Sequence, residues 1–455
     1  MKYSPLKGAF LLSLCSAIAL NAAVLTSSQL RFGLSKNSFP STLADFASQR
    51  SEDDELWYWL NLARLQQANG DFNLSIQSFE KGYAILDEYE NRATVSLRNL
   101  SSFVGSALLT KGSESYYGKG YERTLMHTLN ALNYIMSGDF EGAAVEMRRM
   151  EQRQEFWLKE SEEKIKKAAE EKEKAKRQGN EIPSIPQGYS MAALLEDSDV
   201  REMANNYQDP FSYTLSSIIL DISGQSAASG NSAEISLKRA LALNPNVTKA
   251  FVKSPQGSPA SVTKQSTKMN VTVIVLAGEA PSLKIEKIRF PIYYASEYTS
   301  IDLPSYTPPV NDINGVTIMS NKMRLHPPRL LNTDIMAYRT LKDELPGELA
   351  KAVVRATTKA ITAKQASDHF GNLGGFVASL VMDAGSSLVD AGYRNWEVLP
   401  NSGYIMQFET KKGGILSLSM NGHEESLTLP ADKKGAVVLV SYLTPDNIRI
   451  DHVAY

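Results

Sequence analysis

The clearest hydrophobic pattern runs over residues 117–157 and predicts two helices joined by a short turn. Apolar side chains recur every three or four residues on both sides of Ser137-Gly138-Asp139, a polar break where glycine suits a backbone with positive φ. Small side chains at the start of the second helix allow close packing against the first. The two apolar faces consist of Leu125, Leu129, Leu132, Ile135 and Met136, and of Ala143, Ala144, Met147 and Met150.

A similar pair of helices is predicted around Gly70, in the pattern of a tetratricopeptide repeat of about 34 residues. The turn Gly70-Asp71-Phe72 precedes Gly138-Asp139-Phe140 by 68 residues, which is two repeat lengths. A third hairpin is predicted over residues 211–245 and a degraded copy over residues 90–116. The repeat positions of the first hairpin are Trp59, Leu62, Ala63, Gly70, Ser75, Phe79 and Gly82.

Beyond the central hairpin the second helix continues as a run of Glu, Lys and Ala, which predicts a charged helix over residues 158–178. Opposite charges four residues apart, such as Glu160 and Lys164, stabilise a helix whose surface is solvated. A coiled-coil arm is the alternative, although its apolar seam would be weak. The solvated helix is the preferred interpretation.

From residue 269 the pattern changes to short apolar runs typical of strands. Residues 270–277 and 282–294 are expected to form a β-hairpin, and glycine-containing turns after residue 394 predict a small antiparallel sandwich. The expected fold class is α+β with several domains: tetratricopeptide-like helical hairpins, then a β-hairpin and helical region, then a C-terminal β-sandwich. The predicted division is a signal peptide (1–22), a leader (23–50), a tetratricopeptide-like domain (51–247), a linker (248–268), a β-rich segment (269–330), a helical block (331–393) and a β-sandwich-like domain (394–455).

The N-terminus has the outline of an export signal, with Lys2 and Lys7 before a short apolar run and small residues. Cys15 is the one cysteine and a candidate for lipid attachment, but Leu14 stands where bacterial lipoproteins carry a small residue. A cleaved signal and export to the periplasm are therefore expected. Attachment to the inner face of the outer membrane, through a lipid on Cys15, is the alternative.

The composition restricts the classes of function. With 48 Lys and Arg against 50 Asp and Glu, the chain has no basic excess, so nucleic acid is not an expected partner. The five histidines show no metal-ligand spacing, and no nucleophile motif occurs, so neither metal, cofactor nor catalytic residues are expected. The chain is predicted not to be an enzyme. A carboxylate pair assembled in three dimensions, as in a cell-wall or glycan hydrolase, remains the less favoured alternative.

Stacked helical hairpins expose the first helix of each pair on a concave surface that accepts an extended peptide or a partner helix. This surface predicts a set of partner-binding residues, and Arg64, Gln67 and Thr128 are the foremost because they are polar. Trp57 also belongs to it, with packing between repeats as its alternative role. Glu122 and Arg123 are further candidates, or else form an internal pair that ties helices together.

The order of parts resembles an uncharacterised family of bacterial envelope proteins, usually lipoproteins, with tetratricopeptide-like repeats in front and a β-domain behind. The resemblance implies a scaffold or adaptor that binds an envelope protein or peptide through the helical groove, near cell-wall synthesis machinery at the outer membrane. A structural or oligomerising component built through the β-domains is the alternative. The resemblance rests on Tyr117 to Glu122-Arg123, Ala131-Leu132-Asn133-Tyr134, Gly138 to Ala143, Glu146-Met147-Arg148-Arg149, Asp209-Pro210-Phe211, Val271 to Pro291, Arg394-Asn395-Trp396 and Leu399-Pro400.

Overall fold

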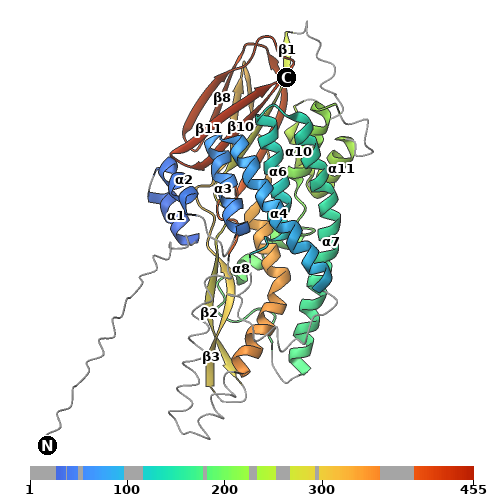
Figure 1. Cartoon of the computed structure of the whole chain (residues 1–455), viewed down its shortest axis with the longest axis vertical. Helices are drawn as coiled ribbons and strands as arrows, with labels where there is room; N and C mark the ends of the chain where they lie inside the picture. Colours follow the sequence, from blue (N-terminus) through green and yellow to red (C-terminus); the bar gives the residue numbers. More distant parts are fainter. Residues whose placement is uncertain are drawn as a thin grey trace, which may run out of the picture.

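The computed structural model describes residues 27–36, 38–49, 55–96, 116–177, 182–224, 233–252, 267–292, 297–358 and 394–455. Within these ranges the chain combines helices with mostly antiparallel sheets, which is the predicted α+β class. The helices form one layer, and two sheets at the upper left of Figure 1 form a second and a third. The predicted signal peptide and Cys15 lie outside the described residues.

Two helical pairs form the middle of the helical layer: α3 (Glu55–Asn69) with α4 (Phe72–Ser96), and α6 (Gly120–Met136) with α7 (Phe140–Arg177). Gly70 and Gly138 occupy the two turns with φ of +84° and +83°, a region that residues with a Cβ rarely adopt. Both predicted turns are therefore confirmed. The degraded copy predicted over residues 90–116 lies mostly outside the described residues.

A third helical pair corresponds to the hairpin predicted over residues 211–245. Its first helix starts at Pro210, and Asp209 caps it by accepting a hydrogen bond from the Ser212 amide (2.7 Å). Proline suits this first turn because the amide it lacks would have no partner within the helix. The helices here are α10 (Pro210–Ile222), α11 (Ala233–Leu243) and the short elements α8 (Ala192–Leu195), α9 (Ser198–Glu202) and η2 (Pro245–Ala250).

The charged half of α7 packs on one side against a helix over residues 333–358. Gly347 permits the close approach, because a Cβ there would lie 3.0 Å from the Cβ of Ala168. Glu171 and Lys351 form an ion pair across the contact, 3.8 Å from Oε2 to Nζ. The charged helix predicted over residues 158–178 is thus present as the second half of α7 with most of its described side chains exposed, and its alanines add a packing face.

The central sheet has the strand order β11-β10-β1-β7-β6 and draws on distant parts of the sequence. β1 lies parallel to β10 and antiparallel to β7, so Ile274 pairs with Leu439 on one side and Ile405 on the other. Most of β1 is buried, which explains its unbroken apolar run. The strands are β1 (Lys268–Ala277), β6 (Arg329–Asn332), β7 (Ser402–Lys411), β10 (Gly435–Thr444) and β11 (Asn447–Ala454).

The outer sheet, with strand order β5-β4-β8-β9, packs on one face of the central sheet. Val273 and Val275 of β1 share this core with Leu416, whereas Ile274 and Leu276 join the core of the helical layer. Because side chains alternate along a strand, β1 holds the three layers together. The outer strands are β4 (Thr317–Ser320), β5 (Met323–Leu325), β8 (Ile415–Met420) and β9 (His423–Thr428).

The predicted hairpin between residues 270–277 and 282–294 is wrong. β2 (Leu283–Ile292) pairs instead with β3 (Glu297–Tyr306), and this two-stranded sheet extends away from the other sheets (Figure 1). A strand as apolar as β1 needs cover on both faces, and β1 obtains it inside the central sheet, between the helical layer and the outer sheet. The β-rich segment (269–330) and the β-sandwich-like domain (394–455), predicted as separate units, therefore share the central sheet.

The predicted leader, residues 23–50, contains two helices rather than an unstructured connection. α1 (Ser27–Lys36) and α2 (Phe39–Ser48) bury Leu30 and Phe46 in the core that the helices share with the central sheet. The prediction underestimated this segment because its serines and threonines hid a short apolar pattern. α1 also forms one wall of a cavity.

Candidate functional site

The six residues predicted to contact a partner are all buried in the folded chain. Their exposed fractions are 1% for Trp57, 0% for Arg64, 1% for Gln67, 0% for Glu122, 3% for Arg123 and 0% for Thr128. None of them lines the cavity of which α1 forms a wall, so at this degree of burial they do not meet a partner that arrives from solvent. Their assignment as a partner-binding surface is therefore wrong, and the chain itself covers the side of the helices on which they lie.

The C-terminal part of the chain reaches these residues directly. The Trp57 indole Nε1 donates to the carbonyl oxygen of Asn395 (3.0 Å), and the Arg394 guanidinium lies 5.1 Å from the centre of the Trp57 ring. Arg64 donates from Nη2 to Oγ of Ser441 on β10 (3.1 Å). The groove expected to receive a foreign peptide thus receives the segment that begins at Arg394, together with the central sheet.

Glu122 fastens that segment to α6. Its Oε1 accepts from the Trp396 amide (2.7 Å), and its Oε2 accepts from the Lys119 amide (2.5 Å) and the Tyr116 hydroxyl (2.9 Å). Burial raises the pKa of Glu122, against which these hydrogen bonds act. Arg123, its expected partner, donates from Nε to the carbonyl oxygen of Tyr117 (3.0 Å).

Gln67 and Thr128 bind neighbouring helices. Gln67 Nε2 donates to the carbonyl oxygen of Leu129 and to Oδ1 of Asn133, both at 2.7 Å, and Thr128 shares a hydrogen bond of 2.7 Å with Ser212 of α10. Buried amides and hydroxyls need such partners. These residues therefore hold helices together rather than recognise a ligand.

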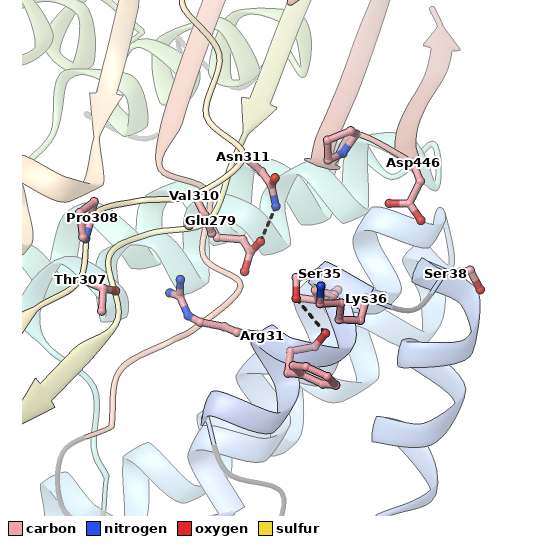
Figure 2. Close-up of a pocket in the computed structure, with 13 residues that line it drawn as sticks. Arg31, Ser35, Lys36, Ser38, Glu279, Thr307, Pro308, Val310, Asn311 and Asp446 are labelled. Atoms are coloured by element: carbon pink, nitrogen blue, oxygen red, sulfur yellow. Dashed lines mark hydrogen bonds between the residues drawn. The ribbon is translucent and has the colours of Figure 1, made fainter.

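A cavity of about 1050 Å³ lies elsewhere, between α1 and three connections of the β layer (Figure 2). These connections are the residues after β1, the loop 307–311 and the turn between β10 and β11. Gly278 permits this construction, because a Cβ there would lie 3.0 Å from the backbone of Val310 and Asp312. The cavity is lined by Arg31, Phe32, Leu34, Ser35, Lys36, Ser38, Glu279, Thr307, Pro308, Val310, Asn311, Pro445 and Asp446.

The exposed rim of this cavity combines large apolar side chains with polar ones. Phe32 of α1 is 61% exposed and Val310 of the loop opposite is 43% exposed, although both are large hydrophobic residues. Pro308 and Pro445 extend the apolar lining. Large apolar side chains gathered around a concave surface are typical of a binding site, because a ligand that covers them releases ordered water.

One arginine is held in the wall by a buried glutamate. Arg31 donates from Nε to Oε2 of Glu397 (2.6 Å), and from Nη2 to the carbonyl oxygens of Ala280 and Glu397. The Glu397 side chain is fully buried and also accepts a hydrogen bond from Ser282 Oγ (2.9 Å). This pair ties α1 to the segment 394–401 and so fixes the position of the cavity wall.

Glu279 lies at the floor of the cavity and is only 2% exposed. Its Oε1 accepts from Asn311 Nδ2 (2.8 Å), while Oε2 has no hydrogen-bond partner among the described residues. Figure 2 shows the carboxylate between Asn311 and Arg31. Burial raises its pKa to about 7; the charge of Glu397 adds to this rise, and Arg31 and the Asn311 hydrogen bond oppose it.

Three carboxyl groups lie in or beside this cavity, those of Glu279, Asp446 and Glu397. Glu279 and Asp446 line the cavity, whereas Glu397 does not line it and is engaged by Arg31. No group of three or more His, Cys, Asp or Glu residues able to hold a metal ion occurs within the described ranges. The cavity therefore offers one buried carboxyl group, that of Glu279, and a rim with both apolar and polar side chains.

Replacing Glu279 with glutamine should raise the free energy of unfolding at about pH 8. Burial raises the pKa of Glu279 from 4.5 to about 7, so the folded chain keeps a proton that the unfolded chain has released. The stability linked to this proton is fully present below pH 4.5 and is lost as the pH rises through about 7, by about 3 kcal/mol in all. Thermal unfolding of wild type and E279Q at several pH values measures the difference. Equal pH dependence of the two proteins would contradict the shifted pKa.

The residues of the cavity were not found from the sequence. Gly278 to Pro281 suggested a hairpin turn, and Arg31 lay in the predicted leader. A glutamate two residues after the end of an apolar strand was the one available signal, since strand ends commonly carry site residues. The partners of that glutamate come from α1 and from residue 311, and no local pattern connects these parts of the chain.

Comparisons of the chain with protein-family models, with curated proteins and with solved structures gave no match. Among the helices that the structure describes, none is long and apolar enough to cross a membrane.

Proposed function

We propose that this chain is a non-enzymatic scaffold or adaptor that binds a protein or peptide of the bacterial envelope, and that the cavity beside α1 is its recognition site. The observation that carries this proposal is the cavity itself, with an exposed apolar rim above a buried carboxyl group. A volume of about 1050 Å³ accommodates several side chains of an extended segment. The cavity replaces the helical groove in this role.

In this proposal the pairs α3 with α4 and α6 with α7 are tetratricopeptide-like repeats whose concave side supports the chain's own β layer. Trp57 and Arg64 bind Asn395 and Ser441 there, so the repeats act as a frame. A frame of this kind holds α1 and the loops of the β layer in register, which a preformed cavity requires.

The proposed setting is the periplasm, on the inner face of the outer membrane if Cys15 is lipidated, near cell-wall synthesis machinery. It rests on the signal-like residues 1–22 and on the resemblance to envelope proteins. Residues 1–22 lie outside the described part of the chain. The location is therefore tested together with the binding site.

The test is photo-crosslinking in living cells with p-benzoylphenylalanine at single positions. We expect a discrete crosslinked product from position 32 and from position 310, because both side chains stand on the rim of the cavity. Ile415 is the matched control, since it is as exposed as Phe32 (61% each) but lies on β8, outside the cavity lining. Fractionation of the same cells should place the product in the envelope.

The expected product at position 32 should disappear when Val310 is changed to Lys, because a charge on the opposite rim removes apolar contact. An identical pattern from positions 32 and 415 would contradict the cavity as the recognition site. Crosslinks found only in the cytosolic fraction would contradict the envelope setting. Circular dichroism of each variant controls for loss of folding.

The alternative of an oligomer built through the β layer is less well favoured. β9 is an edge strand of the outer sheet, and edge strands can pair with a second copy. Glu424 and Glu425 are exposed on this strand, however, and charges at an edge oppose such pairing.

A further inference from the structure

The charges around Glu279 leave one negative charge without a dedicated cation. Arg31 of α1 is engaged by Glu397 at 2.6 Å, with further bonds to two backbone carbonyl oxygens. Glu279 and Glu397 thus share a single guanidinium, and each has one carboxylate oxygen without a hydrogen-bond partner among the described residues. A buried site of this composition must take up either a proton or a second cation.

The other elements around the cavity do not supply that cation. The loop 307–311 contains no charged residue, and Asn311 contributes only a neutral amide. Lys36 and Asp446 are exposed at the rim and have opposite charges. Asp446 accepts hydrogen bonds from the Phe39 amide and the Thr444 hydroxyl. The imbalance therefore remains at the floor, next to Glu279.

The shape above Glu279 specifies more than a cation. Phe32, Pro308 and Val310 offer apolar surface over the carboxyl group, which suits a long aliphatic stem that ends in a charged group. An exposed aromatic ring also attracts an organic cation. Lysine and arginine side chains combine such a stem with such a charge, and neighbouring apolar residues of the same peptide would cover the rim.

We infer that the ligand of this cavity is a basic, partly apolar peptide segment, and that a lysine or arginine side chain of this segment is anchored on Glu279. This inference rests on the proposed function, since it names the chemistry of the ligand that the cavity takes. Binding replaces the proton of Glu279 with the charged side chain, so a proton is released into solvent. The anchored cation then neutralises the negative charge of Glu279, because Arg31 is already paired with Glu397.

Isothermal titration of the full chain with three small probes tests this inference. The probes are acetyl-Leu-Lys-Leu-amide, its norleucine analogue, which lacks only the ammonium group, and n-pentylammonium, which lacks the peptide. We expect the lysine peptide to bind about tenfold or more tightly than either other probe at about pH 8, because only it offers both charge and apolar cover. E279Q should bring the affinities of the lysine and norleucine peptides together, whereas E424Q, far from the cavity lining, should not.

The pH dependence supplies a second readout. The pKa of Glu279 in the free protein is about 7. Lowering the pH from about 8 to about 6 should therefore reduce the affinity for the lysine peptide about tenfold and leave the affinity for the norleucine peptide unchanged. Titrations in two buffers of different ionisation enthalpy should show proton release at pH 7 in the wild type and none in E279Q.

The outcomes separate this inference from the proposed function. Equal affinity of the lysine and norleucine peptides would overturn the cationic anchor while leaving the cavity a binding site. Equal affinity of pentylammonium and the lysine peptide would overturn the assignment of the ligand as a peptide and would indicate a free amine. Absence of binding by every probe would overturn the inference, and the proposed function would fail as well only if the crosslinks at positions 32 and 310 were also absent.

Discussion

Glu122→Ala should lower the free energy of unfolding by about 3 to 5 kcal/mol, because it removes one acceptor group from three buried donors. The amides of Lys119 and Trp396 and the hydroxyl of Tyr116 all donate to this carboxylate, which is itself fully buried. The alanine cannot accept these bonds, and the space that it leaves is closed to bulk water. The loss should appear in chemical unfolding at about pH 7.

Two comparisons make this result specific. Glu122→Gln keeps one oxygen as acceptor and should cost less than the alanine, while Glu141→Ala, at an exposed position of α7, should change stability by less than about 0.5 kcal/mol. Trp396 lies in a ring contact with Phe79, 5.9 Å between centres, so its fluorescence should shift when the segment detaches. An unchanged stability of Glu122→Ala would refute the role of this carboxylate as a fastening between α6 and the segment at Trp396.

The double variant Arg64→Ala with Gln67→Ala should also unfold at a markedly lower temperature, by an amount that corresponds to about 3 to 5 kcal/mol. Both side chains are fully buried, and Gln67 joins α3 to Leu129 and Asn133 of α6. An open groove would give the opposite result, with loss of partner capture and an unchanged melting temperature. Differential scanning calorimetry together with the crosslinking assay distinguishes the two.

Arg64→Met is the matched control for the charge of this arginine. Burial lowers the pKa of Arg64 to about 9, and its Nε has no hydrogen-bond partner among the described residues. Methionine keeps most of the volume without a buried charge, so this variant should be close to wild type in stability or slightly above it. A loss as large as that of the alanine variant would show that the bond to Ser441 outweighs the cost of burying the charge.

Helices and turns were the most predictable part of this protein. Residues three or four apart lie on one face of a helix, so the apolar faces around Gly70 and Gly138 could be read directly from the sequence. The positive φ of both glycines follows from the same local requirement. The cap at Asp209 before Pro210 is equally local.

The site was poorly predicted because its parts meet only in the folded chain. Arg31 and Glu397 are separated by 366 positions, and Glu279 and Asn311 by 32. No periodic pattern in the sequence connects the two residues of either pair. The mistaken assignment of Arg64 and Gln67 to a partner-binding surface has the same origin. The sequence placed them on the correct face of the helix, but it did not show that the β layer covers that face.

The sequence alone determined where helices start and turn and which strands are apolar, because these depend on neighbouring residues. The tertiary structure decided that β1 lies between β10 and β7 and that the chain covers its own helical groove. It also decided that Glu279 is buried near Arg31, an arginine that is already paired with Glu397. The physical reason is that burial and charge balance depend on which distant surfaces meet, and that is settled only when the apolar faces of all three layers are packed together.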